Sequence, residues 1–190
     1  MARVQYSDSV KTIEGGYRVI ATPTVSGMTN PKYRDIKSCT DFYAPLISAE
    51  FSKLGGAKDP FLDETIVLTH IYQESLFNSR ANNSYPARGL GQFIPGTQKD
   101  VKIIDAYNYG DALPKIVTFV NNNFKAYKSV QERDLHMSLG VMAYFSGRRK
   151  NIEEFKRARD DLLNIDPLHY LRTFEVTYRR LGGQGFRTQW

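Results

Sequence analysis

One carboxylate, Glu74, lies within a stretch of sequence that otherwise has an apolar helical pattern. Val67, Ile71 and Glu74 follow one another at spacings of four and three residues, so a helix would carry all three side chains on one face. A carboxylate on the core-facing side of a helix is costly unless it is paired or stays protonated. A partly desolvated carboxyl group keeps its proton near neutral pH, so this pattern indicates a general acid.

A structural role for Glu74 is the alternative. His70 precedes it by four residues, so the two side chains could form an ordinary pair along one helix face. The carboxyl group could instead be satisfied inside the core, or the side chain could reach solvent at the end of the helix. The position of Glu74 alone leaves these alternatives open.

The residues that follow Glu74 favour the general acid. They are, in chain order, Ser75, Gly89-Leu90-Gly91-Gln92, Ala143-Tyr144 and Tyr178. These motifs, spread over residues 60–182, resemble the soluble lytic transglycosylase (SLT) family of the lysozyme-like superfamily, to which goose-type lysozymes also belong. The resemblance implies a mainly α fold, with a lysozyme-like helical domain.

The resemblance also implies roles for the matching residues, with Glu74 as the catalytic residue. The substrate-binding residues that it implies are Ser75, Gly89, Leu90, Gly91, Gln92, Tyr144 and Tyr178. Ser75 would hold the carboxyl group of Glu74, and the two glycines would let the backbone approach a sugar chain closely because they lack a Cβ. The side-chain amide of Gln92 offers both a donor and an acceptor to sugar groups.

Two positions depart from the family pattern. Gly91 stands where the family usually has Met, and Phe145 stands where it usually has Asn. We expect Gly91 to leave more room beside a glycan cleft. Phe145 is expected to remove a polar contact to the sugar.

The implied reaction is that of a peptidoglycan lytic transglycosylase, an enzyme that cleaves the β-1,4 bond between N-acetylmuramic acid and N-acetylglucosamine and forms a 1,6-anhydro ring. One carboxylate is enough for this reaction, because the acetamido group of the substrate stabilises the developing positive charge. No cofactor is implied. No metal is implied either, since the three histidines and one cysteine show no ligand spacing.

Other functions remain as alternatives. A hydrolytic muramidase on the same fold would gain support from a second carboxylate facing Glu74, for which the nearest downstream candidates are Asp100, Asp105 and Asp111. A non-catalytic glycan-binding or structural virion module would keep the fold without the chemistry. A nucleic-acid-binding protein rests on basic charge alone, so no nucleic acid is expected as a partner.

The composition bears on partners and location. A formal net charge of +6 favours an anionic partner, here the glycan strands of peptidoglycan. The N-terminus shows no signal peptide, and no apolar run is long enough to span a membrane. A wall-degrading domain of this kind resembles bacteriophage enzymes, which are virion-associated or made in the host cytoplasm and act on the cell wall for penetration or lysis.

The chain divides into three predicted parts. Residues 1–38 form an irregular or partly β N-terminal arm, because the runs 3–6 and 17–25 are β-prone. Residues 39–182 form the helical domain, and residues 183–190 form a C-terminal tail. We expect the arm to dock onto a virion or lysis-system protein or to pack behind the helical domain.

Local signals predict the helices of the domain. Thr40 or Asp41 is the expected N-cap of the first helix, and Gly55-Gly56 is its stop. Asp59 is the expected N-cap of the second helix, with Pro60 in its first position. The remaining helices are expected at residues 95–107, 111–127, 131–146, 149–163 and 166–181.

Overall fold

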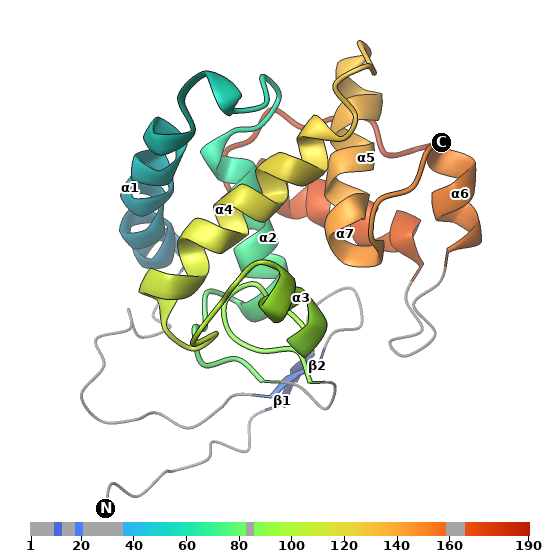
Figure 1. Ribbon diagram of the computed structural model, residues 1–190. Coiled ribbons are helices and arrows are strands. Elements are labelled where there is room, and N and C mark those ends of the chain that lie inside the picture. Colours follow the sequence, from blue (N-terminus) through green and yellow to red (C-terminus); the bar gives the residue numbers. More distant parts are fainter. Residues whose placement is uncertain (1–9, 13–17, 21–35, 83–85, 159–165) are drawn as a thin grey trace, which may run out of the picture.

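The computed structural model describes residues 10–12, 18–20, 36–82, 86–158 and 166–190 (Figure 1). This part of the chain is mainly helical, as the sequence predicts. Its helices are α1 (Ile36–Leu54), α2 (Glu64–Ser75), α3 (Pro95–Asp100), α4 (Tyr109–Lys125), α5 (Arg133–Ser146), α6 (Ile152–Arg157) and α7 (Pro167–Arg180), with a short 3-10 turn, η1 (Gly55–Ala57), after α1. Each helix in these ranges is too short or too polar to cross a lipid bilayer.

The N-terminal arm contains two short strands, as predicted. Strands β1 (Val10–Thr12) and β2 (Arg18–Ile20) pair antiparallel, with Val10 opposite Ile20. β2 lies in the β-prone run 17–25, whereas the run 3–6 lies outside the described residues. The domain boundaries at residues 38 and 182 stay predictions.

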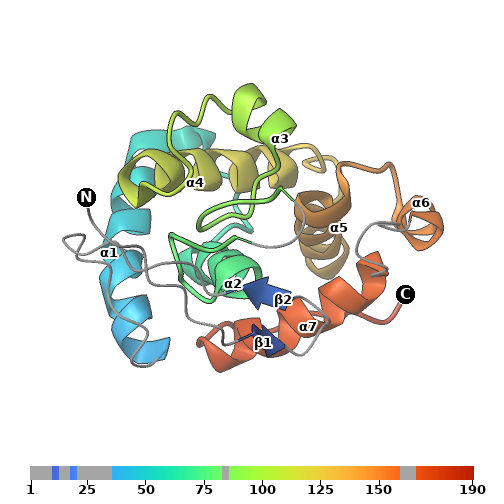
Figure 2. The same cartoon turned by 90° about the horizontal axis from the view of Figure 1, so that it is seen from below.

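Helix α2 lies at the centre of the molecule. It packs against α1, α4 and α7, and the two perpendicular views show it surrounded by them (Figures 1 and 2). Nine of its twelve residues are buried, including Val67, Ile71 and Glu74. A helix that is buried on most of its circumference belongs to a core, and side chains that it carries are held rigidly by their neighbours.

The start of α2 differs from the prediction. Its N-cap is Asp63, whose side chain accepts a hydrogen bond from the backbone N–H of Ile66. Asp59 is buried in the turn before the helix, where it accepts from the N–H of Phe61 and lies 3.2 Å from Nε2 of His136. Both aspartates are competent caps by residue type, and the contact with α5 keeps Asp59 out of that position.

Other predicted boundaries were also wrong. α1 begins at Ile36, so Thr40 and Asp41 lie inside it. α3 ends at Asp100 instead of near Tyr107, because Asp111 Oδ2 accepts the backbone N–H groups of the two residues at 104 and 105 and holds that segment as a loop. α6 covers only part of the predicted range 149–163, of which residues 159–163 lie outside the described ranges.

The predictions for α4, α5 and α7 are confirmed to within two residues at each end. A glycine follows the end of α7: Gly182 has a φ of +100°, a backbone conformation that favours glycine. Beyond it the chain folds back on α5: Trp190 Nε1 donates to Ser138 Oγ, and the Arg187 guanidinium lies 3.8 Å from the centre of the Trp190 ring. The C-terminal tail is therefore packed against the helical domain.

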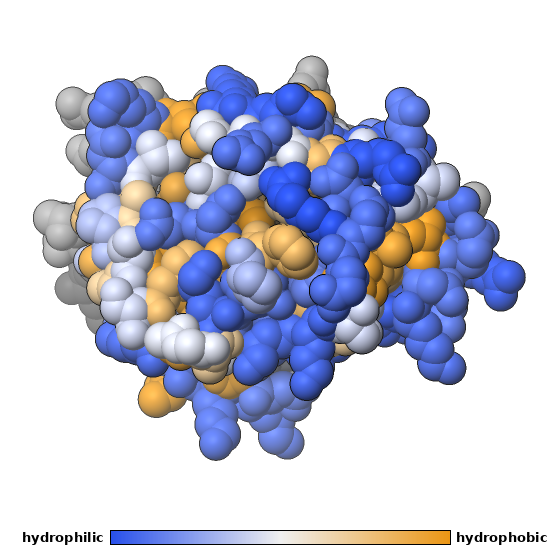
Figure 3. Space-filling view, turned by 90° about the horizontal axis from the view of Figure 1, so that it is seen from above, coloured by the Kyte–Doolittle hydropathy of each residue, from blue (hydrophilic) through white to orange (hydrophobic). Residues whose placement is uncertain are grey.

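The surface seen from above is mostly hydrophilic, with small groups of hydrophobic residues between the polar ones (Figure 3). Large exposed hydrophobic side chains among the described residues are Ile94, Ile104 and Val176. They belong to separate segments, and isolated exposed hydrophobic residues are ordinary on soluble domains.

We predict that Asp63→Ala lowers the free energy of unfolding by about 2 kcal/mol, because it removes the N-cap of the central helix and the acceptor of the buried Tyr178 hydroxyl. Urea unfolding measures the change. The matched control is Asp41→Ala, which removes an exposed carboxylate paired with Lys37 and should change stability by less than about 0.5 kcal/mol. Equal losses in the two variants would contradict the assignment.

Candidate active site

Glu74 lies in the last turn of α2, one residue before the helix ends. Leu76 and Phe77 have positive φ angles of 52° and 62°, so the backbone turns sharply away directly after Ser75. Left-handed backbone is unfavourable for such side chains, and the burial of Phe77 against the ring of Tyr43 offsets the cost. Glu74 is thereby held at the end of a buried helix with 8% of its surface exposed.

The carboxyl group of Glu74 is held by a tyrosine from α7. The hydroxyl of Tyr170 donates a hydrogen bond of 3.0 Å to Glu74 Oε1. The same hydroxyl lies 3.1 Å from Nδ1 of His70, which is one turn before Glu74 on α2. His70 and Glu74 are therefore linked through Tyr170, which replaces the simple pair that the spacing allowed.

Burial sets the protonation of these groups. It raises the pKa of Glu74 from 4.5 to about 8, and the hydrogen bond from Tyr170 opposes this shift in part. Burial also lowers the pKa of His70 from 6.5 to about 3. At neutral pH the imidazole is uncharged and the carboxyl group carries a proton, which is the state a general acid requires.

A second tyrosine, Tyr144 of α5, closes the other side of this group. Its ring stacks on the His70 imidazole, with ring centres 4.3 Å apart. Burial and the nearby Glu74 charge raise the pKa of Tyr144 well above its ordinary value, so its hydroxyl stays protonated. That hydroxyl donates to the carbonyl of Gly91 at 2.7 Å, and so ties the glycine-containing loop to the site.

Gly91 does not leave extra room, which corrects the expectation from sequence. A Cβ at this position would lie 2.7 Å from the Tyr144 hydroxyl and 2.9 Å from Cγ1 of Ile116. The space that a side chain would need is already filled from α4 and α5. Gly91 is thus required for packing within the protein.

The rest of the Gly89–Gln92 motif is also turned inward. Gly89 has a φ of +73°, and its Cβ would lie 1.8 Å from the carbonyl oxygen of Ala106, so the position requires glycine. The side-chain nitrogen of Gln92 donates to the carbonyls of Ala81 and Gly89, and Leu90 is fully buried. The motif therefore packs against the protein itself and hydrogen-bonds to its own loop.

The two remaining site residues expected from sequence lie at opposite ends of α2. The hydroxyl of Ser75, next to Glu74, donates to the backbone carbonyl of Ile71. Tyr178 donates to Asp63 at the opposite end of α2, so it does not accompany Glu74. Sequence reasoning missed Tyr170, although it lies two helical turns before Tyr178 on the same face of α7, and considered His70 only as a direct pair of Glu74.

Phe145 takes part in the site as a packing residue. Its ring stacks on Tyr170, with ring centres 4.8 Å apart and an angle of 15° between the planes. An aromatic side chain at this position therefore supports the tyrosine that binds Glu74.

The carboxylates proposed for a hydrolytic mechanism have other contacts. Asp111 accepts backbone N–H groups in the loop before α4, and Asp105 accepts the N–H of Tyr107. Asp100 is an exposed residue at the end of α3. Among the described residues, no charged side chain contributes to the shift in the pKa of Glu74, which comes from burial and from the Tyr170 hydrogen bond.

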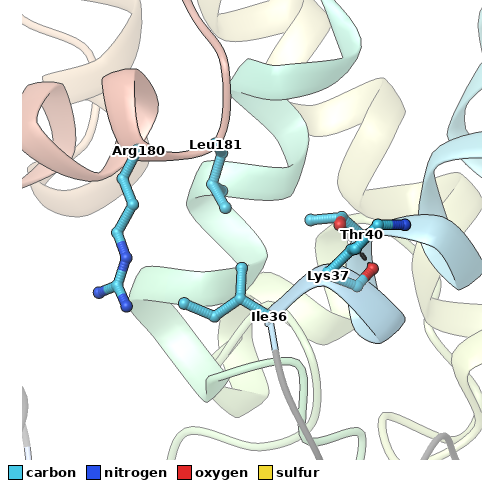
Figure 4. A pocket seen from close by; sticks show the side chains of 5 residues that line it. All are labelled: Ile36, Lys37, Thr40, Arg180 and Leu181. Carbon is cyan, nitrogen blue, oxygen red and sulfur yellow. Dashed lines mark hydrogen bonds between the residues drawn. The ribbon is translucent and has the colours of Figure 1, made fainter.

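A cavity of about 620 Å³ lies elsewhere, between the start of α1 and the end of α7 (Figure 4). It is lined by Ile36, Lys37, Thr40, Arg180 and Leu181. None of the residues around Glu74 takes part in it. In the described ranges no group of three His, Cys, Asp or Glu side chains could hold a metal ion.

Fold and site together define a class of protein: a helical domain with a buried acid, Glu74, at the end of its central helix. A family model described as the transglycosylase SLT domain matches residues 55–164, which is more than half of the chain. The chain belongs to this family, as its motifs predicted. A search of curated proteins found no match. Family membership supports lytic transglycosylase activity on peptidoglycan in general.

We predict that Gly91→Ala destabilises the protein by about 1–3 kcal/mol, because the added methyl group overlaps Tyr144 and Ile116. In the Gly91→Ala/Tyr144→Phe double variant the loss should be smaller than the sum of the single losses, since the nearest overlapping atom is gone. Denaturant unfolding of all four proteins gives the coupling. Gly96→Ala is the control, because a Cβ there meets nothing within 4 Å.

A second prediction concerns stability and pH. Folding raises the pKa of Glu74 from 4.5 to about 8, so between these values the unfolded chain releases a proton that the folded protein retains. The burial of Glu74 therefore costs stability that increases as the pH rises through this window. Glu74→Gln should melt at a higher temperature than the native chain at pH 8, and the difference should shrink toward pH 4.5. A difference independent of pH would contradict the assigned protonation.

Proposed function

We propose that Glu74 is the single acid and base of a lytic transglycosylation of peptidoglycan. Its carboxyl group donates a proton to the glycosidic oxygen between N-acetylmuramic acid and N-acetylglucosamine, and the bond from that oxygen to the muramic acid C1 breaks. The acetamido group of the substrate stabilises the positive charge that develops on the sugar. The Glu74 carboxylate then takes the proton from the C6 hydroxyl of the muramic acid, whose oxygen bonds to C1 and closes the 1,6-anhydro ring.

The observation that carries this proposal is the buried carboxyl group of Glu74, of which only one oxygen has a hydrogen-bond partner among the described residues. Tyr170 donates to Oε1, so Oε2 is the oxygen that exchanges a proton with the substrate. The raised pKa supports both steps, because it keeps the acid protonated before cleavage and makes the carboxylate a stronger base afterwards. The Tyr170 hydrogen bond stabilises the anion between the two steps.

The absence of a charged group acting on Glu74, among the described residues, favours this reaction over hydrolysis. An inverting hydrolase uses a second carboxylate to activate water, and a retaining one uses it as nucleophile. Asp105 and Asp111, the nearest candidates with assigned contacts, hold backbone in the loop before α4. Lytic closure of the sugar ring needs no such partner.

We predict that Glu74→Gln lowers the rate of peptidoglycan cleavage by about 10²–10⁴-fold, the usual contribution of a general acid–base group. Mass spectrometry of the digested wall gives the products, and muropeptides with 1,6-anhydro ends are expected from the native chain. Asp100→Asn is the control and should cleave at the native rate. Retained activity in Glu74→Gln would remove the proposed mechanism, and reducing ends in the native digest would identify a hydrolase.

The cleavage rate should also depend on pH through Glu74. The acid must be protonated to act, so the rate should fall as the pH rises through about 8. A profile of cleavage rate against pH, measured with defined glycan strands, tests this alkaline fall in rate.

We further propose that the enzyme serves cell-wall penetration or lysis by a bacteriophage, with the N-terminal arm as its contact to another virion or lysis-system protein. The net charge of +6 would favour approach to anionic wall polymers. Detection of the protein in purified particles, compared with its release only at lysis, separates the two settings.

A further inference from the structure

His70 is a buried polar residue for which the proposed reaction has no direct use. It is fully buried on α2, one turn before Glu74. Its Nδ1 faces the Tyr170 hydroxyl at 3.1 Å, whereas its Nε2 has no hydrogen-bond partner in the described part of the chain. An imidazole with one unsatisfied nitrogen is costly to bury, so its place in the core calls for an explanation.

We propose that His70 is a positioning residue: as an Nδ1–H donor to the oxygen of Tyr170, it directs the Tyr170 hydroxyl proton toward Glu74 Oε1. This inference rests on the proposed function of Glu74 and adds a residue to its mechanism. His70 touches neither the substrate nor the proton that is transferred.

Counting protons supports this direction. The Tyr170 hydroxyl carries one proton, and the acceptors that the described residues offer it are Nδ1 of His70 and Oε1 of Glu74. When Nδ1 of His70 carries the imidazole proton, the Tyr170 oxygen must accept there, and its own proton goes to Glu74. With the other tautomer, an N–H at Nε2 would be buried without an acceptor, which is rare in folded proteins. The tautomer that directs Tyr170 toward Glu74 is therefore the favoured one.

The aromatic neighbours hold this chain of groups in place. The His70 ring lies against Tyr144, with centres 4.3 Å apart, and against Phe174, with centres 4.5 Å apart. The Tyr170 ring is covered by Phe145 at 4.8 Å. Neither ring can turn without displacing these neighbours, so the direction of the two hydrogen bonds is built into the packing.

The consequence concerns the oxygen that carries the reactive proton. With Tyr170 always donating to Oε1, the proton of Glu74 is confined to Oε2, and the anion formed after cleavage keeps a donor at Oε1. Among the described residues, the titratable groups that face Glu74 are His70 from its own helix, Tyr144 from α5 and Tyr170 from α7. His70 and Tyr144 stay uncharged near neutral pH, so the hydrogen bond from Tyr170 is the contact that adjusts Glu74 within this group.

The test compares two substitutions of equal size, His70→Asn and His70→Leu. The Asn side chain can place an N–H donor close to the position of Nδ1, whereas Leu has none, and both remove the ring. We expect His70→Asn to keep kcat within about threefold of the native value. His70→Leu should lose about tenfold or more in kcat with little change in KM, because the hydrogen bond from Tyr170 to the Glu74 anion weakens once the Tyr170 hydroxyl is no longer oriented and polarised by His70.

The pH dependence gives a readout that packing alone would not move. In His70→Leu the Tyr170 hydroxyl loses the donor that orients and polarises it, so its hydrogen bond to the Glu74 carboxylate weakens. The alkaline limb of the rate profile should therefore shift to higher pH, and in His70→Asn it should stay at the native position. Carbon-13 NMR titration of the Glu74 carboxyl group measures the same shift in the pKa of Glu74 in the protein without substrate. Equal loss of kcat in both variants, with unchanged titration of Glu74, would overturn the proposal.

Tyr170→Phe protects the test against a variant that does not fold. It removes only the hydroxyl, and it should raise the pKa of Glu74 as His70→Leu does. In the Tyr170→Phe protein, a further His70→Asn substitution should leave the pKa of Glu74 unchanged. A Glu74 titration that is the same in Tyr170→Phe and the native protein would overturn the inference. Retained cleavage by Glu74→Gln would refute the proposed function, while the NMR titration would still decide whether His70 directs Tyr170.

Discussion

The burial of one carboxyl group at the end of the central helix is the constraint on which the rest of the site depends. α2 is enclosed by α1, α4 and α7, so Glu74 cannot be hydrated as a surface carboxylate is. An ionised group there would be expensive, and the site meets this cost by keeping Glu74 protonated and giving it a hydrogen bond. Its neighbours His70 and Tyr144 are uncharged for the same physical reason.

The loop after α2 shows how tightly the surroundings are adapted to this group. Its glycines look like openings for a ligand, yet each is pressed against protein atoms, Gly89 against Ala106 and Gly91 against Tyr144. The Gln92 side chain joins two carbonyls of the same loop. The loop is therefore a packed wall, and its polar residues mainly satisfy its own backbone, as buried polar groups generally must.

The two departures from the family pattern have a common physical origin. Gly91 is small because the Tyr144 hydroxyl occupies the space beside it, and Phe145 is aromatic where it covers the ring of Tyr170. Both positions thus serve tyrosines that pack around Glu74 or His70. In this chain the polar contact expected from Asn is replaced by stacking that holds a hydrogen-bond donor.

Sequence patterns determined the helical class, the positions of α4, α5 and α7, and the place of Glu74 on the buried face of its helix, because helical periodicity is a local property. They failed where a distant contact decided, as when Asp111 ended α3 and His136 drew Asp59 away from the cap of α2. The same limit applied to the tyrosines of α7. Tyr170 and Tyr178 share one face of that helix, and only antiparallel packing puts Tyr178 beside Asp63 at the start of α2 and Tyr170 beside Glu74 at its end. The direction and offset of two packed helices depend on the whole core, so tertiary structure alone decided which tyrosine holds the acid.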